Sequence, residues 1–358
     1  MASQTVLQLL GPSTGGIRRH VGTLAKGLEE RGWRAPIAGP PDVMNGVAAQ
    51  SHALPMNLST QTMFSARHSI RRIAEAETPN LIHAHGLKAG WLASLAKLDV
   101  PVLVTVHNVV LRETAGRSAP VLRLLERLLP RRVDHVIAVS NEIADRLPGR
   151  QTVIPPAGPV PTAEREPGKV RESYHMGNDQ PLVVTVARLH PQKDLFTLLA
   201  AAAEVKAAVQ NVRFIVVGEG PERDRLETRR DELGLSETVT FVGYRPNPAD
   251  EMNAADVVVL SSRWEGSPLV VIETFRLGRP VVATAVGAVP EAVIDKQTGR
   301  LVPPGDPPSL AGAIIDVLTD TVGSAQLAEA GMLAARKQFD PDLLIDRVVT
   351  VYEDLIQK

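Results

Sequence analysis

Two glutamates separated by a polar loop and a helix-forming run are the residues whose spacing most clearly suggests chemistry. Glu265 and Glu273 are eight positions apart, and Gly266, Ser267, Pro268 and Leu269 open the segment between them. The apolar run at 257–260 that precedes them is typical of a buried strand. Glycine and serine suit a loop and an N-cap and proline suits the first helical turn, so a helix is predicted to begin there.

The start of such a helix is a binding site for an anion. Its first backbone N–H groups have no partner within the helix, and the helix dipole adds about half a positive charge. Glu265 would lie before this site and Glu273 beside it, on the second helical turn. A phosphate-bearing ligand with hydroxyl groups at both ends, such as a sugar nucleotide, would fit that arrangement.

A pair of cations follows another strand-like run. Arg188 and Lys193 are five positions apart and straddle the turn after residues 182–186. Arginine offers a planar fork of donors and lysine a point charge, so the two could hold a diphosphate from both sides. The alternative is that Arg188 and Lys193 only form ordinary ion pairs on the protein surface.

Three histidines stand at the ends of strand-like runs, where open parallel sheets bind ligands. His83 and His85 would point to one face of a strand and could imitate a metal-binding pair, but no carboxylate or third ligand stands at a suitable spacing. We therefore predict no metal. We interpret His85 and Gly86 as lining the side of the site that faces a second substrate, the acceptor. His107 is the stronger candidate for chemistry, and a structural histidine is the alternative.

Two glycine loops follow strand-like runs. Gly15 and Gly16 come after the first strand, and Gly218 and Gly220 follow residues 213–217. Glycine lets the backbone approach a ligand closely. Neither loop has the spacing of a dinucleotide or Walker motif, which disfavours a nicotinamide dehydrogenase.

Short apolar runs alternate with amphipathic segments along the whole chain, which indicates parallel sheets covered by helices on both faces. We predict an α/β fold of two doubly wound domains, 1–165 and 166–340, followed by a terminal helix in 341–358. A proline- and glycine-rich linker at 154–161 separates the two sets of strands, which are predicted at 5–10, 35–38, 81–84, 101–106, 134–139 and 151–154, and at 182–186, 213–217, 238–242, 256–260, 280–284 and 300–302.

Composition sets the class of protein. The 358 residues suggest two domains, and 44% hydrophobic and 22% charged residues are typical of a soluble globular protein. The absence of cysteine excludes disulfides and thiolate metal sites. No signal peptide and no apolar run of about 18 residues is visible, so a cytoplasmic location is expected. No nucleic-acid partner is expected.

The first 165 residues are basic, with 19 Lys and Arg against 12 Asp and Glu. Within them, the segment 117–132 is amphipathic and carries several arginines. Such a helix can lie on the anionic inner face of a membrane, or it can be a surface helix with a solvated basic face.

The spaced elements together resemble the retaining glycosyltransferases of family four, which have the GT-B fold. The resemblance is carried by the Glu265-x7-Glu273 element, by Gly278-Arg279-Pro280-Val281-Val282-Ala283-Thr284 and by Gly287-Ala288-Val289-Pro290-Glu291. It implies two Rossmann-like domains that face each other across a cleft, a donor site in the second domain and a terminal helix that returns to the first.

The resemblance also implies roles for residues. Arg188 and Lys193 would hold the donor diphosphate, with the N–H groups around Ser267 to Leu269. Glu265 would bind sugar hydroxyls and Glu273 the ribose. His107 would meet the sugar, and Gly15 and Gly16 would touch donor phosphate or acceptor. Gly218 and Gly220 would lie below the nucleobase, and Tyr244 belongs to an element at the edge of the base.

The implied reaction is transfer of a sugar from a UDP- or GDP-sugar to an acceptor hydroxyl, with retention of configuration and with no cofactor or metal. We expect a front-face displacement in which the departing phosphate helps to deprotonate the acceptor. Two alternatives remain open, a sugar-nucleotide epimerase on the same fold and a non-catalytic nucleotide-sugar binding protein.

Overall fold

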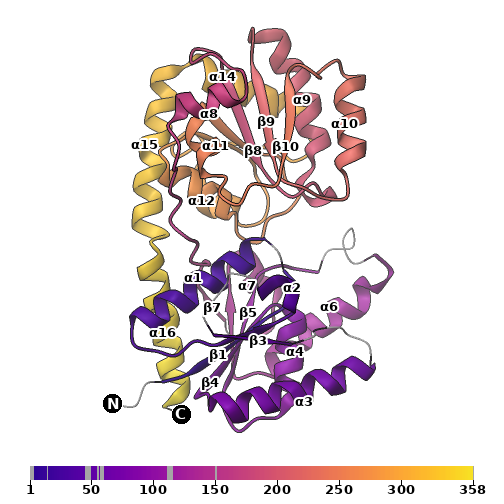
Figure 1. The fold of residues 1–358 in the computed structure, drawn as a ribbon, viewed down its shortest axis with the longest axis vertical. Helices are drawn as coiled ribbons and strands as arrows, with labels where there is room; N and C mark the ends of the chain where they lie inside the picture. Colours follow the sequence, from indigo (N-terminus) through magenta and orange to yellow (C-terminus); the bar gives the residue numbers. More distant parts are fainter. Residues whose placement is uncertain are drawn as a thin grey trace. The chain divides into compact units, whose positions relative to one another are not determined.

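The computed structural model describes residues 4–13, 15–44, 50–54, 56, 60–110, 116–149 and 151–357 (Figure 1). The chain forms two compact units. Unit 1 contains residues 1–159 and 340–358, and unit 2 contains residues 160–339, against the boundaries at 165 and 340 that were expected from the sequence.

Unit 1 is built on a seven-stranded parallel sheet in the order β3-β2-β1-β4-β5-β6-β7. The strand at the β3 edge was not predicted, because it is three residues long and its side chains are partly or fully exposed. The strands are β1 (Val6–Leu10), β2 (Ile37–Gly39), β3 (Ser51–Ala53), β4 (Leu81–His85), β5 (Val102–Val106), β6 (His135–Ala138) and β7 (Thr152–Val153).

The helices of unit 1 flank this sheet (Figure 1). They are α1 (Gly16–Glu30), α2 (Pro41–Met44), α3 (Thr60–Glu77), α4 (Leu87–Ala96), α6 (Ala119–Leu128), α7 (Asn141–Arg146) and α16 (Pro341–Ile356), with the 3₁₀ turns η1 (Gly116–Ser118) and η2 (Leu129–Arg131).

The last helix, α16, is part of the core of unit 1. Leu344, Ile345, Val348 and Tyr352 recur at helical spacing and are buried in one cluster with side chains of α1 and the sheet. A Cβ atom on Gly27 of α1 would lie 2.3 Å from Ile345 Cδ1, so glycine allows the two helices to approach. Each buried leucine or isoleucine contributes about 1.5–3 kcal/mol to such packing.

Unit 2 contains a six-stranded parallel sheet in the order β10-β9-β8-β11-β12-β13. Its strands are β8 (Leu182–Val186), β9 (Arg213–Val217), β10 (Val239–Gly243), β11 (Val257–Leu260), β12 (Val281–Thr284) and β13 (Arg300–Val302). Its helices are α8 (Pro167–Ser173), α9 (Leu195–Ala208), α10 (Arg223–Glu232), α11 (Ala249–Ala254), α12 (Leu269–Arg276), α13 (Val289–Ala292), α14 (Pro307–Thr319) and α15 (Thr321–Gln338), with the 3₁₀ turn η3 (Pro191–Lys193).

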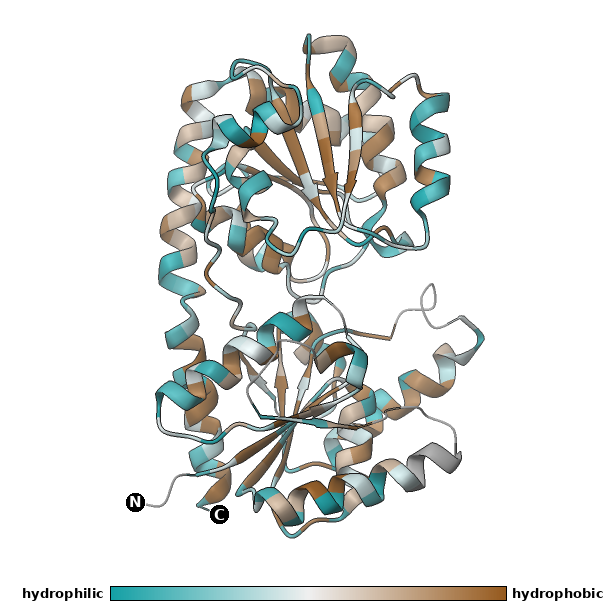
Figure 2. Ribbon diagram, viewed as in Figure 1, coloured by the Kyte–Doolittle hydropathy of each residue, from teal (hydrophilic) through white to brown (hydrophobic). Residues whose placement is uncertain are grey.

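The central strands of both sheets are buried on both faces. All side chains of β1, β4, β5, β11 and β12 are buried, and these strands are mostly hydrophobic in Figure 2. Continuous apolar runs are what a parallel sheet covered on both faces requires. The α/β fold with two doubly wound sheets is therefore confirmed. Among the described residues, no helix has the length and apolar character needed to cross a membrane.

The strand order defines one topological switch point in each sheet. In unit 1 the chain proceeds outward from β1 to β3 and then returns to place β4 on the other side of β1. In unit 2 it proceeds from β8 to β10 and then places β11 on the other side of β8. Ligands of doubly wound sheets bind beyond the carboxyl ends of the strands at such points.

Candidate functional site

The loop after β8 carries the two predicted phosphate-binding cations to the switch point of unit 2. Arg188 is exposed, two residues beyond the end of the strand, and Lys193 is the last residue of η3. The Nζ atom of Lys193 lies 2.5 Å from Oε1 of Glu265, which follows the neighbouring strand β11. The structure thus brings together two side chains that the sequence placed in separate motifs.

Hydrogen bonds fix the loops after β8 and β11 against each other. The Ser261 hydroxyl donates to the carbonyl of Lys193 at 2.9 Å, and the Arg263 N–H donates to the carbonyl of Gln192 at 2.8 Å. Because both loops are tied at two points, the cation of one loop and the carboxylate of the other are held in place.

Glu265 is only 6% exposed, and both its side chain and its backbone are held. Its Oε1 also accepts a hydrogen bond from the Ser262 hydroxyl at 2.5 Å, and its carbonyl accepts one from the Ala288 N–H at 3.0 Å. Gly287 has a φ of +54°, and a Cβ atom there would lie 1.8 Å from the Glu265 carbonyl oxygen. The glycine of the Gly287–Glu291 motif therefore allows the β12 loop to close over Glu265.

The helix between the two glutamates begins later than the sequence suggested. Its N-cap is Pro268 and not Ser267, and α12 runs from Leu269 to Arg276 without a side-chain cap. Leu269 donates its N–H to the Ser267 carbonyl, so that donor is already engaged. The reason is that Pro268, at φ −84° and ψ 76°, lies outside the helical region and turns the chain one residue before the helix. Glu273 lies on the second turn, as predicted, and is 1% exposed.

The glycine loop after β9 packs directly on the cation loop. A Cβ atom on Gly218, whose φ is +143°, would lie 1.9 Å from the carbonyl oxygen of Ala187, and one on Gly220 would lie 2.3 Å from that of Leu189. These glycines therefore support the backbone on either side of Arg188. Tyr244, which follows β10, is 63% exposed.

One buried acid of unit 2 was not singled out from the sequence. Asp194, next to Lys193, accepts hydrogen bonds from the Thr197 hydroxyl at 2.9 Å and pairs with Arg263, with 3.1 Å between Oδ2 and Nε. Asp194 has a left-handed backbone conformation and precedes α9. Its place next to Lys193 was the signal in the sequence that could have pointed to it.

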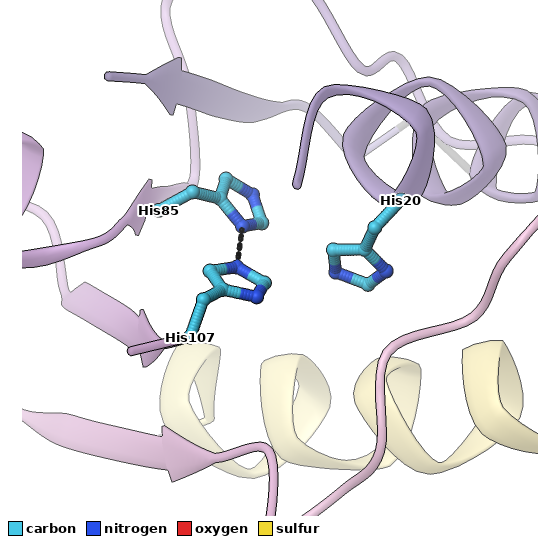
Figure 3. Close-up of side chains that lie close together, drawn as sticks. All are labelled: His20, His85 and His107. Carbon is cyan, nitrogen blue, oxygen red and sulfur yellow. Dashed lines mark hydrogen bonds between the residues drawn. The ribbon is translucent and has the colours of Figure 1, made fainter. Parts of the chain in front are cut away.

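The switch point of unit 1 is lined by histidines (Figure 3). His85 ends β4, His107 follows β5, and His20 reaches the same place from α1. The ring centroids are 5.6 Å apart for His20 and His85, 5.2 Å for His20 and His107, and 5.5 Å for His85 and His107. His85 and His107 were predicted from the sequence as site residues, whereas His20 was not, because its position in a helix gave no sign of it.

Burial keeps these imidazoles neutral. It lowers the pKa of His20 to about 4, although a hydrogen bond to the Ala157 carbonyl opposes the shift. Burial, together with the neighbouring histidines, holds the pKa of His83, His85 and His107 well below the ordinary value. A buried cation without a counter-ion is costly, so each ring carries one proton near neutral pH.

A chain of hydrogen bonds then assigns the position of each proton. Gln8 donates its amide to the Tyr352 hydroxyl at 3.2 Å, and its Oε1 lies 2.7 Å from Nε2 of His85, which must therefore be the donor. Nδ1 of His85 is left as an acceptor, so His107 donates its Nε2–H to it across 3.2 Å. His107 thus presents an unprotonated Nδ1.

His83 has both ring nitrogens engaged in this network. Its Nδ1 is 2.6 Å from the Tyr352 hydroxyl, and its Nε2 is 2.6 Å from the Thr105 hydroxyl. His83 and His85 do lie on one face of β4, with centroids 4.1 Å apart. His20 and His107, and not His83, gather with His85 so that one nitrogen of each lies within 4.8 Å of the others, a grouping that the strand spacing did not reveal.

A pocket of about 300 Å³ lies beside His107 in unit 1. Gly86, predicted on the acceptor side, has a φ of +88° and lines this pocket, whereas His85 is buried behind it. Hydrogen bonds of 3.1 Å from Val110 to Glu126 and from Arg123 to Val110 tie one wall to α6. The lining residues of this pocket are Ile17, Gly86, Leu87, His107, Asn108, Val109, Val110 and Leu122.

The first predicted glycine loop lies at the start of α1. Gly15 is the N-cap of this helix and Gly16 is its first residue.

The two doubly wound sheets, with a charged switch point in unit 2 and a pocket at that of unit 1, define a GT-B type of protein. Residues 168–333 match the family "Glycosyl transferases group 1", and residues 14–157 match "Glycosyltransferase Family 4". The chain belongs to the group 1 glycosyltransferases.

Individual relatives agree with this assignment. The chain is 30% identical to a D-inositol 3-phosphate glycosyltransferase of Mycolicibacterium vanbaalenii over 79% of its own length and 70% of that protein's. It is 31% identical to a GDP-mannose-dependent alpha-(1-6)-phosphatidylinositol monomannoside mannosyltransferase of Mycolicibacterium smegmatis over 69% of its length, and the match spans 63% of that relative, less than two thirds.

The fold agrees with solved structures of the same class. The crystal structure of Anabaena HepE in complex with UDP-glucose has a TM-score of 0.86 to this chain and 23% sequence identity, and the match covers 98% of this chain and all of that one. This likeness shows the fold.

Proposed function

We propose that this glycosyltransferase transfers a hexose from a UDP- or GDP-sugar to an acceptor hydroxyl with retention of configuration, and that it holds the donor diphosphate without a divalent metal. The observation that supports the proposal is that the loop with Arg188 and Lys193 follows β8, that Glu265 and α12 follow the neighbouring strand β11, and that Lys193 pairs with Glu265. It is supported by the family assignment, and relatives described as GDP-mannose-dependent or solved with UDP-glucose favour such a donor.

Positive charge from the protein takes the place of a metal in this proposal. Arg188 is exposed and, among the described residues, has no hydrogen-bonding or ion-pair partner to prevent it from meeting a phosphate. Lys193 directs one of its three protons to Glu265, which leaves two for phosphate oxygens. The N-terminal turn of α12 adds its dipole, and donors fixed in advance at a leaving group stabilise the charge that develops there.

Glu265 and Glu273 are assigned the two ends of the donor. Glu265 keeps an oxygen, Oε2, besides the one that accepts from Lys193 and Ser262, and we assign it to sugar hydroxyls. Glu273 is assigned to the ribose, Gly218 and Gly220 to the loop below the base, and Tyr244 to its edge. Gly15 and Gly16 are assigned to donor phosphate or acceptor.

His107 is assigned to the transferred sugar, with Gly86 and the pocket beside it on the acceptor side. The hydrogen-bond chain gives His107 a defined role, because Nε2–H points to His85 and Nδ1 remains an acceptor for a hydroxyl proton. No covalent intermediate is proposed. The departing phosphate takes the acceptor proton on the face from which it leaves, so the new bond forms on the same face as the broken one.

Product analysis tests the reaction class. Wild-type protein is incubated with UDP-glucose and GDP-mannose in the presence of EDTA, with and without an inositol acceptor, and products are read by NMR. A new α-linked glycoside from the α-linked donor supports the proposal. A β-linked product would overturn retention, an isomerised donor without acceptor would point to an epimerase, and unchanged donor that nevertheless binds would point to a binding protein.

We further propose that unit 1 meets an anionic membrane surface through α6, at the cytoplasmic face. Val121 and Leu124 are 62% and 58% exposed beside the exposed Arg117, Arg123 and Arg127. Apolar side chains flanked by cations are typical of an interfacial helix. Sedimentation with vesicles containing phosphatidylserine should capture the wild type and should capture less of Val121→Ser/Leu124→Ser; equal capture of both would contradict the proposal.

A further inference from the structure

His20, His85 and His107, at the switch point of unit 1, surround a common point (Figure 3). If one zinc ion held three imidazoles at about 2.0–2.1 Å with tetrahedral angles, each ring centroid would lie about 3.2 Å from the metal and the centroids about 5.2 Å from one another. The observed separations are 5.6, 5.2 and 5.5 Å. Two nitrogens bound to such an ion would be about 3.3 Å apart, and His85 Nδ1 and His107 Nε2 are 3.2 Å apart.

The outer hydrogen bonds of the rings direct nitrogen lone pairs toward that point. Nδ1 of His20 lies 2.9 Å from the carbonyl oxygen of Ala157. Nδ1 therefore donates its proton to that carbonyl, and Nε2 of the same ring is unprotonated. His85 donates Nε2–H to Gln8, so its Nδ1 is unprotonated. A histidine ligand of a metal ordinarily donates its second nitrogen to a carbonyl or a similar acceptor, which fixes the ring and its tautomer.

We propose that His20, His85 and His107 form a binding site for a borderline divalent metal ion of the zinc class, separate from the diphosphate site of unit 2. The candidate ligand atoms lie within 4.8 Å of one another, so His20 needs to move its ring by only a small distance toward the other two. His107 becomes a ligand through Nε2 when its proton moves to Nδ1, so no net proton is released by that ring.

The donor set determines which metal binds. Within the described part of the chain the cluster consists of imidazoles alone. Three neutral nitrogens and an open position suit Zn²⁺ and Co²⁺, whereas Mg²⁺ and Ca²⁺ require oxygen ligands. His83 is excluded as a ligand, because its two nitrogens are engaged by Tyr352 and Thr105.

A bound ion would occupy His107 and would therefore inhibit transfer. This consequence rests on the proposed function, in which His107 meets the sugar, whereas binding of the ion does not. The enzyme would then be active in EDTA and inhibited by Zn²⁺, the opposite of a metal-dependent transferase.

The test is titration of the full chain, freed of metal with a chelator. Zn²⁺ is titrated in competition with a chromophoric chelator, and Co²⁺ is followed by its visible absorption. We expect one ion per chain, the intense absorption of a low-coordinate nitrogen site, and affinity reduced by about 100-fold or more in His20→Gln and by about 10-fold in Gln8→Leu, which keeps the three ligands but removes the acceptor of His85. The exposed His68 provides the control, and His68→Ala should bind as the wild type does.

Circular dichroism shows whether His20→Gln is folded, and Gln8→Leu tests the site by a second route. The proposal is overturned if the wild-type chain binds no Zn²⁺ in this titration. It is also overturned if His20→Gln and Gln8→Leu bind Zn²⁺ as tightly as the wild type does. Transfer measured in parallel separates the two claims. Stoichiometric Zn²⁺ binding without inhibition would leave the metal site standing and would contradict the role of His107.

Discussion

The two switch points occupy equivalent places in two sheets with the same winding, yet their chemistry is opposite. In unit 2 the carboxyl ends of β8 and β11 present Arg188, Lys193 and Glu265, which are charged and partly ion-paired. In unit 1 the end of β4, the counterpart of β11, presents His85, and the next strand, β5, presents His107. Both rings are neutral and joined in a hydrogen-bonded chain.

The difference follows from what surrounds each loop. In unit 1 the histidines are buried among other histidines, which disfavours any charge. In unit 2 the cation loop faces a carboxylate, so charge is stabilised there. The shared winding therefore supplies a switch point in each sheet, and the residues after each strand decide whether that place is charged or neutral.

Removing the charge of unit 2 should have the largest effect. Arg188→Ala/Lys193→Ala deletes two donors at the leaving diphosphate, and since each such donor is worth about 10²–10³ in rate, transfer should fall by about 10⁴-fold or more. The measurement is initial rate with the donor that the wild type uses. Arg229→Ala, an exposed ion-pair residue on α10, is the control and should keep full activity. If the transfer rate of the double variant stayed within 10-fold of the wild-type rate, the two cations would not be what distinguishes the switch point of unit 2.

A change in unit 1 should instead spare donor binding. His107→Ala is expected to lower kcat by about 100-fold, the scale of one lost polar contact to the transition state. The dissociation constant for the nucleoside diphosphate should remain within about twofold, because the two cations proposed to hold the diphosphate, Arg188 and Lys193, lie in unit 2. Calorimetry with UDP or GDP and steady-state kinetics separate the two quantities. Weaker binding with an unchanged kcat would contradict this division of roles.

The loop that holds Glu265 can be broken without removing any charge. Gly287→Ala forces a Cβ atom to within 1.8 Å of the Glu265 carbonyl oxygen at a positive φ. Such strain and overpacking should cost about 2–4 kcal/mol of unfolding free energy. Gly312→Ala is the matched control, since Gly312 is exposed in α14 with no atom near its missing Cβ, and it should stabilise by up to about 1 kcal/mol. Urea denaturation followed by circular dichroism measures both; equal stability of the two variants would refute the steric argument.

The smallest effect concerns a carboxylate of unit 2 away from the switch point. Burial raises the pKa of Asp250, but hydrogen bonds from Arg165 and from the Glu164 N–H outweigh it, and the net pKa lies below its ordinary 3.8. A lowered folded-state pKa contributes stability above the unfolded-state value, and the contribution is lost as pH falls through the folded-state pKa. Asp250→Asn should therefore destabilise by about 1–3 kcal/mol at pH 7 and by less near pH 3. An equal loss at both pH values would show that the charge is not involved.

The fold could be predicted from the sequence because its strands are continuous apolar runs. Twelve predicted strand positions correspond to strands, and β3 was missed since Ser51, His52 and Ala53 form a short edge strand with no such signal. The start of α12 was misplaced by one residue, because the sequence does not show that Pro268 turns the chain outside the helical region.

The arrangement of side chains was harder to predict because it depends on contacts between distant residues. Gln8 and Tyr352 are 344 residues apart, yet both belong to the chain of hydrogen bonds that assigns the proton of His107. His20 comes from a helix, so no strand spacing relates it to His85 or His107. The ion pair of Lys193 with Glu265 likewise depends on β8 and β11 being neighbours, which strand order and not local sequence decides.

The most direct test is calorimetric titration of UDP and GDP into the wild-type chain in EDTA, repeated with Arg188→Ala/Lys193→Ala. We expect one nucleotide to bind the wild type without metal. Its binding should weaken by about 100-fold or more in the double variant, since two charge-assisted contacts at about 1.5–3 kcal/mol each are lost. If binding disappeared in EDTA and returned with Mg²⁺ or Mn²⁺, or if the double variant bound as tightly as the wild type, the diphosphate would not be held by these residues.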